Sequence, residues 1–124
     1  MTASPSATPA PTDPEDTKII TLARSALART AARQGACLRD TDGRTYAAAS
    51  VQLPHLQLSA VAVAVAMAVS SGAEGLEAVA VAGAEGPDAA DLAVLGDLPG
   101  AGAVLWHVDA RGQVQDRTDL DGRA

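Results

Sequence analysis

The chain has 124 residues, enough for one small domain with a single hydrophobic core but not for two. Its 15 acidic and nine basic residues give a formal net charge of −6. This balance disfavours a nucleic-acid partner, because phosphate binding depends on Lys and Arg. Cys37 is the only cysteine, so neither an internal disulfide nor a cysteine-rich metal site can form, which suits a reducing cytoplasm.

Large apolar side chains are scarce, although hydrophobic residues make up 48 % of the chain. There is no Phe, one Trp and one Tyr, so the core must be built from Ala, Val and Leu, each of which buries little area. This shortage favours a homo-oligomer in which subunits share apolar surface.

Residues 1–12 are mainly Ala, Ser, Thr and Pro, without a basic start or an apolar stretch, so they do not form a signal peptide. We predict a disordered N-terminal tail over 1–12, a folded domain over 13–120 and a C-terminal tail over 121–124. The longest apolar run, residues 58–69, is shorter than the roughly 20 residues that cross a bilayer. The sequence therefore predicts a soluble cytoplasmic protein without membrane contact.

The folded part begins with a helix start signal. Asp13 is a capping carboxylate, Pro14 occupies the first helical position, and acidic residues follow, which predicts a helix to about Arg33. Residues 35–38 and 45–51 then form two strands, joined by a hairpin turn at Asp42-Gly43.

The segment 56–71 admits two readings. Its Val-Ala alternation fits a strand, but its length, its alanine content and the glycine at position 72 favour a buried helix, which we predict. A strand over 76–82, a short helix from Pro87 to about Leu95, and strands over 102–108 and 113–117 follow. A helix between successive strands implies a three-layer α/β/α domain.

Four stretches in this order carry a resemblance to a known family. They are Gly35-Ala36-Cys37-Leu38 with Asp42-Gly43-Arg44-Thr45-Tyr46, the segment Leu58–Ala64, the segment Pro87–Asp91, and the closing strand, turn and strand over Leu105–Thr118. Together they resemble the small nucleoside deaminases of the cytidine deaminase family. The resemblance implies a mixed sheet of about five strands within the α/β/α layers and assembly into a dimer or tetramer.

Members of that family hold one zinc ion with thiolate or His ligands, and a Glu moves protons while zinc-bound water attacks cytosine. The resemblance places the first ligand position at Ser59, the Glu position at Val61, and the paired thiolate positions at Asp88 and Asp91. A hydroxyl and two carboxylates are poor zinc ligands. We therefore expect no zinc cofactor, no metal site and no catalytic residue among these four positions.

The nucleoside pocket implied by the resemblance is also altered. The positions that hold the ribose in the family correspond to Ser50 and Gln52, and the base-stacking aromatic corresponds to Ala32. Stacking is worth about 1–3 kcal/mol per base, which Ala32 cannot supply. Ser50, Gln52 and His55, the last in a polar connection at the pocket mouth, are the candidate ligand-binding residues for weak nucleoside binding.

Each of these residues also has a simpler structural interpretation. Asp88 is expected to cap a helix and Asp91 to offset its dipole, rather than to bind a hard cation together. Ser59 is expected to make a helix-end hydrogen bond rather than to act as a nucleophile. His55 is otherwise a surface histidine. Trp106 and His107 are interpreted as an edge or interface feature, and Cys37 as a small buried hydrophobe.

The sequence leaves three functional hypotheses. The first is an inactive deaminase homologue from a bacterium, kept for homo-oligomeric assembly, for binding a protein partner or for weak nucleoside binding. The second is a divergent nucleoside deaminase that uses a non-standard site. The third is an interaction module that regulates another protein.

Overall fold

The structure is a computed structural model that describes residues 8–120. Residues 8–12 have no regular secondary structure, and the rest of the predicted N-terminal tail, together with residues 121–124, lies outside the described part. Within residues 8–120, no helix is long and apolar enough to cross a membrane.

Helix α1 (Pro14–Thr30) begins as its sequence predicts. The Asp13 side chain caps it by accepting a hydrogen bond of 2.9 Å from the Glu15 N–H, and Pro14 follows directly. The helix ends before the predicted Arg33, because Ala31 adopts the left-handed region at φ 52° and breaks the run of helical dihedrals.

The main sheet has five strands in the order β2-β1-β5-β6-β7. Their bounds are β1 (Gly35–Asp40), β2 (Thr45–Ala49), β5 (Leu76–Ala82), β6 (Val104–Val108) and β7 (Val114–Asp119). Strands β5 and β6 are parallel and the other neighbours are antiparallel, which confirms the mixed sheet. Gly43 takes φ 86° in the β1–β2 turn, as the Asp-Gly pair predicts.

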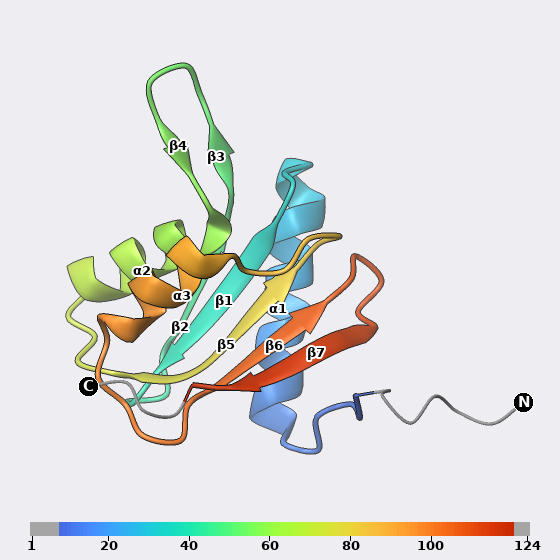
Figure 1. Ribbon diagram of the computed structural model, residues 1–124, viewed down its shortest axis with the longest axis vertical. Helices are drawn as coiled ribbons and strands as arrows, with labels where there is room; N and C mark the ends of the chain where they lie inside the picture. The colour runs from blue at the N-terminus through green and yellow to red at the C-terminus, as the bar shows by residue number, and fades with distance from the viewer. Residues whose placement is uncertain (1–7, 121–124) are drawn as a thin grey trace, which may run out of the picture.

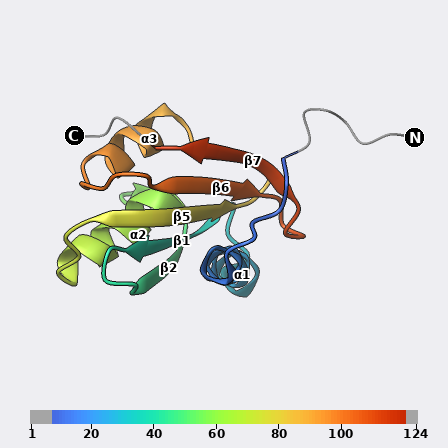
Figure 2. The same cartoon turned by 90° about the horizontal axis from the view of Figure 1, so that it is seen from below.

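Helices cover both faces of this sheet, which confirms the three-layer architecture (Figure 1). Seen from below, along the axis of α1, this helix lies on one side of the sheet and helices α2 (Ala60–Ser70) and α3 (Ala89–Gly96) lie on the other (Figure 2). On the α1 side the helix packs against small strand residues such as Ala78, Ala80 and Ala82. The opposite core joins α2 and α3 to Leu38, Val79, Val81 and Leu105.

The segment between β2 and α2 differs from its prediction. The second strand ends at Ala49, and a separate hairpin follows, made of β3 (Val51–Gln52) and β4 (Gln57–Leu58). The Leu53 N–H donates to the Leu56 carbonyl at 2.9 Å and closes its tip. The helix was predicted from residue 56, but α2 starts only at Ala60, after the capping residue Ser59.

A buried polar cluster joins α1 to the sheet. Arg39 and Asp16 are 5 % and 8 % exposed, and the Arg39 Nη2 lies 2.9 Å from an Asp16 carboxylate oxygen. The other oxygen of Asp16 accepts a hydrogen bond of 3.1 Å from the Trp106 indole N–H. Arg39 also pairs with Glu77 on β5, so this charge is compensated from two elements.

Candidate functional site

The amino ends of α2 and α3 meet, and their capping side chains are joined. The Ser59 hydroxyl accepts from the Ala62 N–H at 3.0 Å, which caps α2, and donates to the Asp91 carboxylate at 2.6 Å. Asp88 caps α3 by accepting from the Asp91 N–H at 2.9 Å, and Asp91 accepts in return from the Asp88 N–H at 3.3 Å. The predicted capping role of Asp88 and the predicted helix-end hydrogen bond of Ser59 are therefore confirmed, and Asp91 lies in the first turn of α3, where its predicted effect on the helix dipole places it.

Asp91 is the buried member of this group, with 4 % of its surface exposed. A buried carboxylate is costly unless hydrogen bonds satisfy it. Here the Ser59 hydroxyl and the Asp88 N–H supply them, and the position in the first turn of α3 places the charge at the positive end of a helix dipole.

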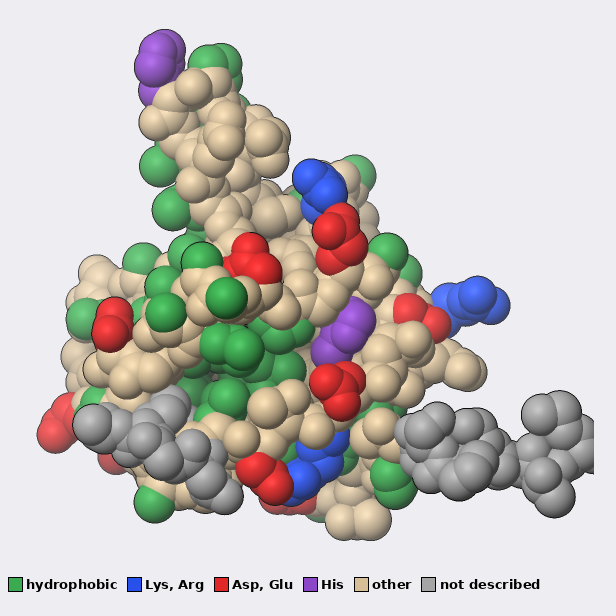
Figure 3. Space-filling view, viewed as in Figure 1, with side chains coloured by type: hydrophobic (Ala, Val, Ile, Leu, Met, Phe, Trp, Pro, Cys, Tyr) green, Lys and Arg blue, Asp and Glu red, His purple; other side chains and the backbone are tan. Residues whose placement is uncertain are grey.

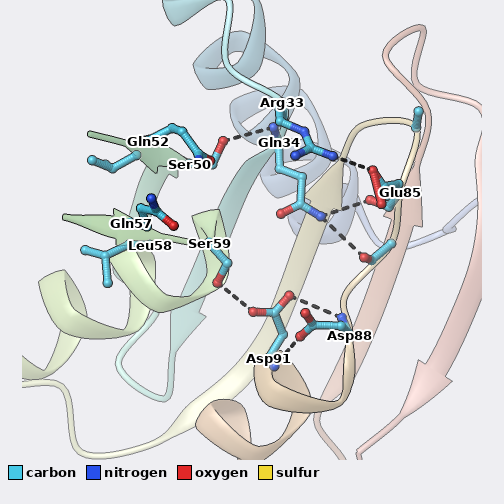
Figure 4. A pocket seen from close by; sticks show the side chains of 13 residues that line it. Arg33, Gln34, Ser50, Gln52, Gln57, Leu58, Ser59, Glu85, Asp88 and Asp91 are labelled. Carbon is cyan, nitrogen blue, oxygen red and sulfur yellow. Dashed lines mark hydrogen bonds and ion pairs between the residues drawn. The ribbon is translucent and has the colours of Figure 1, made fainter. Parts of the chain in front are cut away.

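A cavity of about 570 Å³ opens beside these helix ends (Figure 4). Its walls come from the α1–β1 junction, the end of β2, the β3–β4 hairpin and the loop that follows β5. The lining residues are Arg33, Gln34, Ser50, Val51, Gln52, Gln57, Leu58, Ser59, Ala84, Glu85, Gly86, Asp88 and Asp91. Most of them are polar, so the cavity offers hydrogen-bonding groups on every wall.

Gln34 holds the loop after β5 in place. Its side-chain amide donates to the carbonyl oxygens of Glu85 at 3.0 Å and Gly86 at 3.3 Å. The Gln34 backbone N–H donates to the Ser50 hydroxyl at 3.2 Å on the other side of the cavity. Arg33 adds an exposed ion pair to Glu85 at 2.7 Å. Arg33 and Gln34 together thus hold the loop after β5, which forms one wall of the cavity.

His107 supports the same loop from behind. Its Nε2 lies 2.9 Å from the Gly83 carbonyl oxygen, which can only accept, so the hydrogen belongs on Nε2. Gly86 lies against the ring, since a Cβ built there would come within 3.0 Å of Nδ1. His107 therefore positions the loop and does not line the cavity.

The interpretation of Trp106 and His107 as an edge feature is wrong, and Trp106 is buried rather than at a surface. Strand β6 lies between β5 and β7, not at an edge of the sheet. Trp106 is 5 % exposed and its indole N–H is bonded to Asp16 inside the protein. The two neighbours face opposite sides of the sheet, so they act separately.

The structure brings together most of the predicted site residues and leaves two outside. Ser50, Gln52, Ser59, Asp88 and Asp91 all line the cavity. Val61 is fully buried in the core between α2 and the sheet, and His55 is exposed at the hairpin tip, away from the cavity wall.

Sequence reasoning missed four further polar side chains of the lining, namely Arg33, Gln34, Gln57 and Glu85. One signal was available for Glu85. It lies in a glycine-containing loop directly after the buried strand β5, and in open α/β sheets ligands bind beyond the carboxyl ends of parallel strands. Gln57 could not be found, because it was assigned to a helix.

The residues at the expected metal positions do not fit a zinc ion. Two ligand atoms of one tetrahedral zinc lie roughly 3.3–3.8 Å apart, because each is about 2.0–2.3 Å from the metal. The Ser59 and Asp91 oxygens are 2.6 Å apart and share a hydrogen. Among residues 8–120, no group of three or more His, Cys, Asp or Glu residues is placed to hold a metal.

Comparison with known proteins identifies the class. A sequence profile described as cytidine deaminase-like matches residues 12–112, so the chain belongs to the cytidine deaminase-like family. No functionally curated protein matches the sequence.

Solved structures agree on the fold. A cytidine deaminase from Burkholderia pseudomallei is similar with a TM-score of 0.73 and 21 % identity, over 84 % of this chain and 91 % of that one. A cytidine deaminase from Mycobacterium tuberculosis has a TM-score of 0.65 and 23 % identity, over 75 % and 85 % of the two chains. One from Mycobacterium leprae has a TM-score of 0.63 and 18 % identity, over 80 % and 90 %.

Proposed function

We propose that this chain is a non-catalytic member of its family that binds a nucleoside in the cavity without deaminating it. The observation that carries the proposal is the direct hydrogen bond between Ser59 and Asp91. These side chains occupy positions that the family resemblance assigns to metal ligands, and here they satisfy each other.

The side chain at the proton-carrier position supports the absence of catalysis. Val61 is aliphatic and fully buried, so it cannot take up or release a proton in the cavity. Loss of general acid–base help alone costs about 10²–10⁴ in rate. The donor set at the expected metal positions does not fit zinc either, so the activation of water by a zinc ion lacks its ligands.

The cavity itself supports ligand binding. Its volume of about 570 Å³ lies within the range of small-molecule pockets, which is about 300–1,000 Å³. Gln52 and Gln57 offer both donors and acceptors on exposed side chains of the hairpin. Three carboxylates against one guanidinium in the lining disfavour a phosphorylated ligand and favour an uncharged one.

The proposal is tested by three measurements on one sample grown with zinc. We expect zinc far below one ion per chain, no release of ammonia from cytidine or deoxycytidine, and a higher Tm in the presence of either nucleoside. Gln52→Ala and Gln57→Ala should reduce the Tm shift, whereas His55→Ala, on the same hairpin but outside the cavity, should not. Stoichiometric zinc with turnover would instead establish a divergent deaminase.

A variant provides the positive control for the metal measurement. Replacing Ser59, Asp88 and Asp91 together by Cys supplies three thiolates at the positions implied by the resemblance, and we expect this variant to take up zinc. A wild-type chain without zinc, measured beside a variant with zinc, shows that the assay detects the metal.

The same proposal includes self-assembly. The chain is expected to form a homo-oligomer, because its core of Ala, Val and Leu buries little area per residue. The single cysteine suits the cytoplasm, which we propose as its location, in a bacterium. A different outcome would favour the hypothesis that this chain is an interaction module that regulates another protein. In that case a protein partner would copurify with the chain from native extract, and nucleosides would leave its Tm unchanged.

A further inference from the structure

The β3–β4 hairpin, residues 51–58, is held by hydrogen bonds only at its two ends. Before it, the Ser50 N–H donates to the Gln34 carbonyl at 3.0 Å, and the Ser50 hydroxyl accepts from the Gln34 N–H at 3.2 Å. After it, the Ser59 hydroxyl donates to Asp91 at 2.6 Å. In the part of the chain that the structure describes, no hydrogen bond or ion pair joins residues 51–58 to any other segment. The hairpin is therefore a short arm between two anchored serines.

The hairpin is also outside both hydrophobic cores. Among residues 8–120, neither core includes any of its apolar side chains. Leu53, Leu56 and Leu58 are instead 54 %, 48 % and 37 % exposed, and the hairpin projects away from the rest of the protein (Figures 1 and 3). Each of its strands has only two residues, and an isolated two-stranded hairpin is marginal in water. Little packing therefore opposes a change in its orientation.

The same hairpin forms one wall of the cavity. Val51, Gln52, Gln57 and Leu58 all line it, and Glu85, in the loop after β5, lies across the cavity from them (Figure 4). Gln52 is directly opposite Gln57 in the hairpin, and Val51 is opposite Leu58, so the two side chains of each pair share a face. A rotation of the hairpin therefore moves four lining side chains together, two amides and two apolar groups.

Many of the residues that line the cavity are exposed to solvent. Asp91 is the only buried one, whereas Gln52 and Gln57 on the hairpin, and Ala84 and Glu85 on the loop after β5, are all exposed. Small-molecule sites bury about 70–90 % of the surface of their ligand. A ligand in this cavity therefore needs a cover, and the hairpin is the lining element that the rest of the domain holds least.

We infer that the β3–β4 hairpin is a lid that turns about Ser50 and Ser59 and closes over a ligand in the cavity. Both serines keep their hydrogen bonds while the backbone dihedrals beside them change, as at other hinges, which are a few residues at the ends of elements. Closure moves Gln52 and Gln57 toward the loop after β5, so that their amides contact the ligand and water is excluded. A ligand that binds the closed form better than the open one shifts the equilibrium toward the closed form.

The inference rests on the proposed nucleoside binding, and the distance between two spin labels, measured by pulsed electron paramagnetic resonance, tests it. His55→Cys places one label at the exposed hairpin tip, and Arg111→Cys places the other in the exposed β6–β7 turn. The hairpin and this turn leave the same end of the sheet, with the loop after β5 between them. Cys37 is fully buried, so the labels attach to the introduced cysteines. The control pair joins Arg111→Cys to Arg44→Cys, because Arg44 is exposed at the opposite end of the sheet.

Saturating cytidine should shorten the distance between positions 55 and 111 by more than about 2 Å, the size of the loop rearrangements that accompany binding in other proteins. It should leave the distance between positions 44 and 111 unchanged. The Tm of the same labelled protein is measured with and without cytidine. A raised Tm with an unchanged distance from 55 to 111, or with equal changes in both pairs, overturns the lid and leaves nucleoside binding standing. A Tm that cytidine does not raise, in the wild type as well, overturns both.

Discussion

Asp40, at the end of β1, shows how one buried carboxylate can organise a turn. It is fully buried and accepts hydrogen bonds of 2.9 Å from the Asp42 N–H, the Arg44 N–H and the Tyr46 hydroxyl. Burial alone would raise the pKa of this carboxyl, but the hydrogen bonds outweigh burial and hold its pKa below the ordinary value.

Asp40→Asn should therefore destabilise the fold in a pH-dependent way. The amide leaves one of the three donors without an acceptor, at a cost of about 1–3 kcal/mol in the free energy of unfolding at neutral pH. A lowered folded-state pKa adds stability above the unfolded value, near 3.9, and this stability is lost as the pH falls through the folded value. The difference between variant and wild type should thus shrink in acid, as measured by urea unfolding. Asp42→Asn is the control, because Asp42 is an exposed neighbour of Asp40. An equal loss in the free energy of unfolding for Asp42→Asn would contradict the stabilising role assigned to the Asp40 carboxylate.

Cys37 should be chemically inert in the native protein. It is fully buried, and burial raises the pKa of its thiol to about 11. Because only the thiolate reacts, labelling with a disulfide reagent at about pH 8 should be at least about a hundredfold slower than for the urea-unfolded chain. Fast labelling of the native protein would show that β1 opens to solvent.

At the scale of single residues, prediction worked where the cause is local. The capping roles of Ser59 and Asp88 and the first-turn position of Asp91 follow from residue type and position at a helix start, and the structure confirms them. Trp106 could not be placed in the same way. Its partner Asp16 lies 90 positions away in the sequence, and only the docking of α1 on the sheet brings the two together.

At the scale of elements, Gly35 lies where the backbone of α1 comes very close to the sheet. A Cβ at this position would lie 2.1 Å from the Ala23 carbonyl oxygen. Gly35→Ala should therefore lower the free energy of unfolding by about 3 kcal/mol or more, because backbone atoms must move apart. In α3, Gly96 has no atom within 4 Å of a Cβ position and lacks a positive φ. Gly96→Ala should be neutral or stabilising by about 0.5–1 kcal/mol, and chemical denaturation of both variants distinguishes these outcomes.

The segment before α2 shows why an element could be missed. The alternation of Val and Ala over 61–66 fits a strand and a helix equally well, and the helix was chosen correctly but begun too early. Strands of two residues, such as β3 and β4, are too short to produce a period-two pattern. Because β4 was not recognised from the sequence, Gln57 was not predicted to lie in the cavity wall.

At the scale of the whole molecule, the element order determined the architecture. Helix α1 and strands β1, β5 and β6 have strong local signals, and a helix between strands allows few arrangements. The cavity is different, because it is formed by four segments that are separate in sequence, namely 33–34, 50–52, 57–59 and 84–91. Its residues at the ends of α2 and α3 were found through the family resemblance, whereas Gln34 needed the three-dimensional structure.

The acidic surface gives a prediction for the whole chain. With a net charge of −6 and a pI near 4.6, the protein should not bind labelled duplex or single-stranded DNA in fluorescence anisotropy, even at about 50 mM salt, where phosphate contacts are strongest. Saturable binding that weakens as salt is added would show a basic patch that the net charge conceals.

Trp106 also makes the protein its own optical probe. It is the only tryptophan, so all indole emission arises from one position on β6, where its N–H is held by Asp16 of α1 and its ring lies 5.5 Å from the Arg117 guanidinium of β7. Separation of either neighbour changes the polarity around the ring. The wavelength of intrinsic fluorescence therefore reports detachment of α1 or β7 without any label.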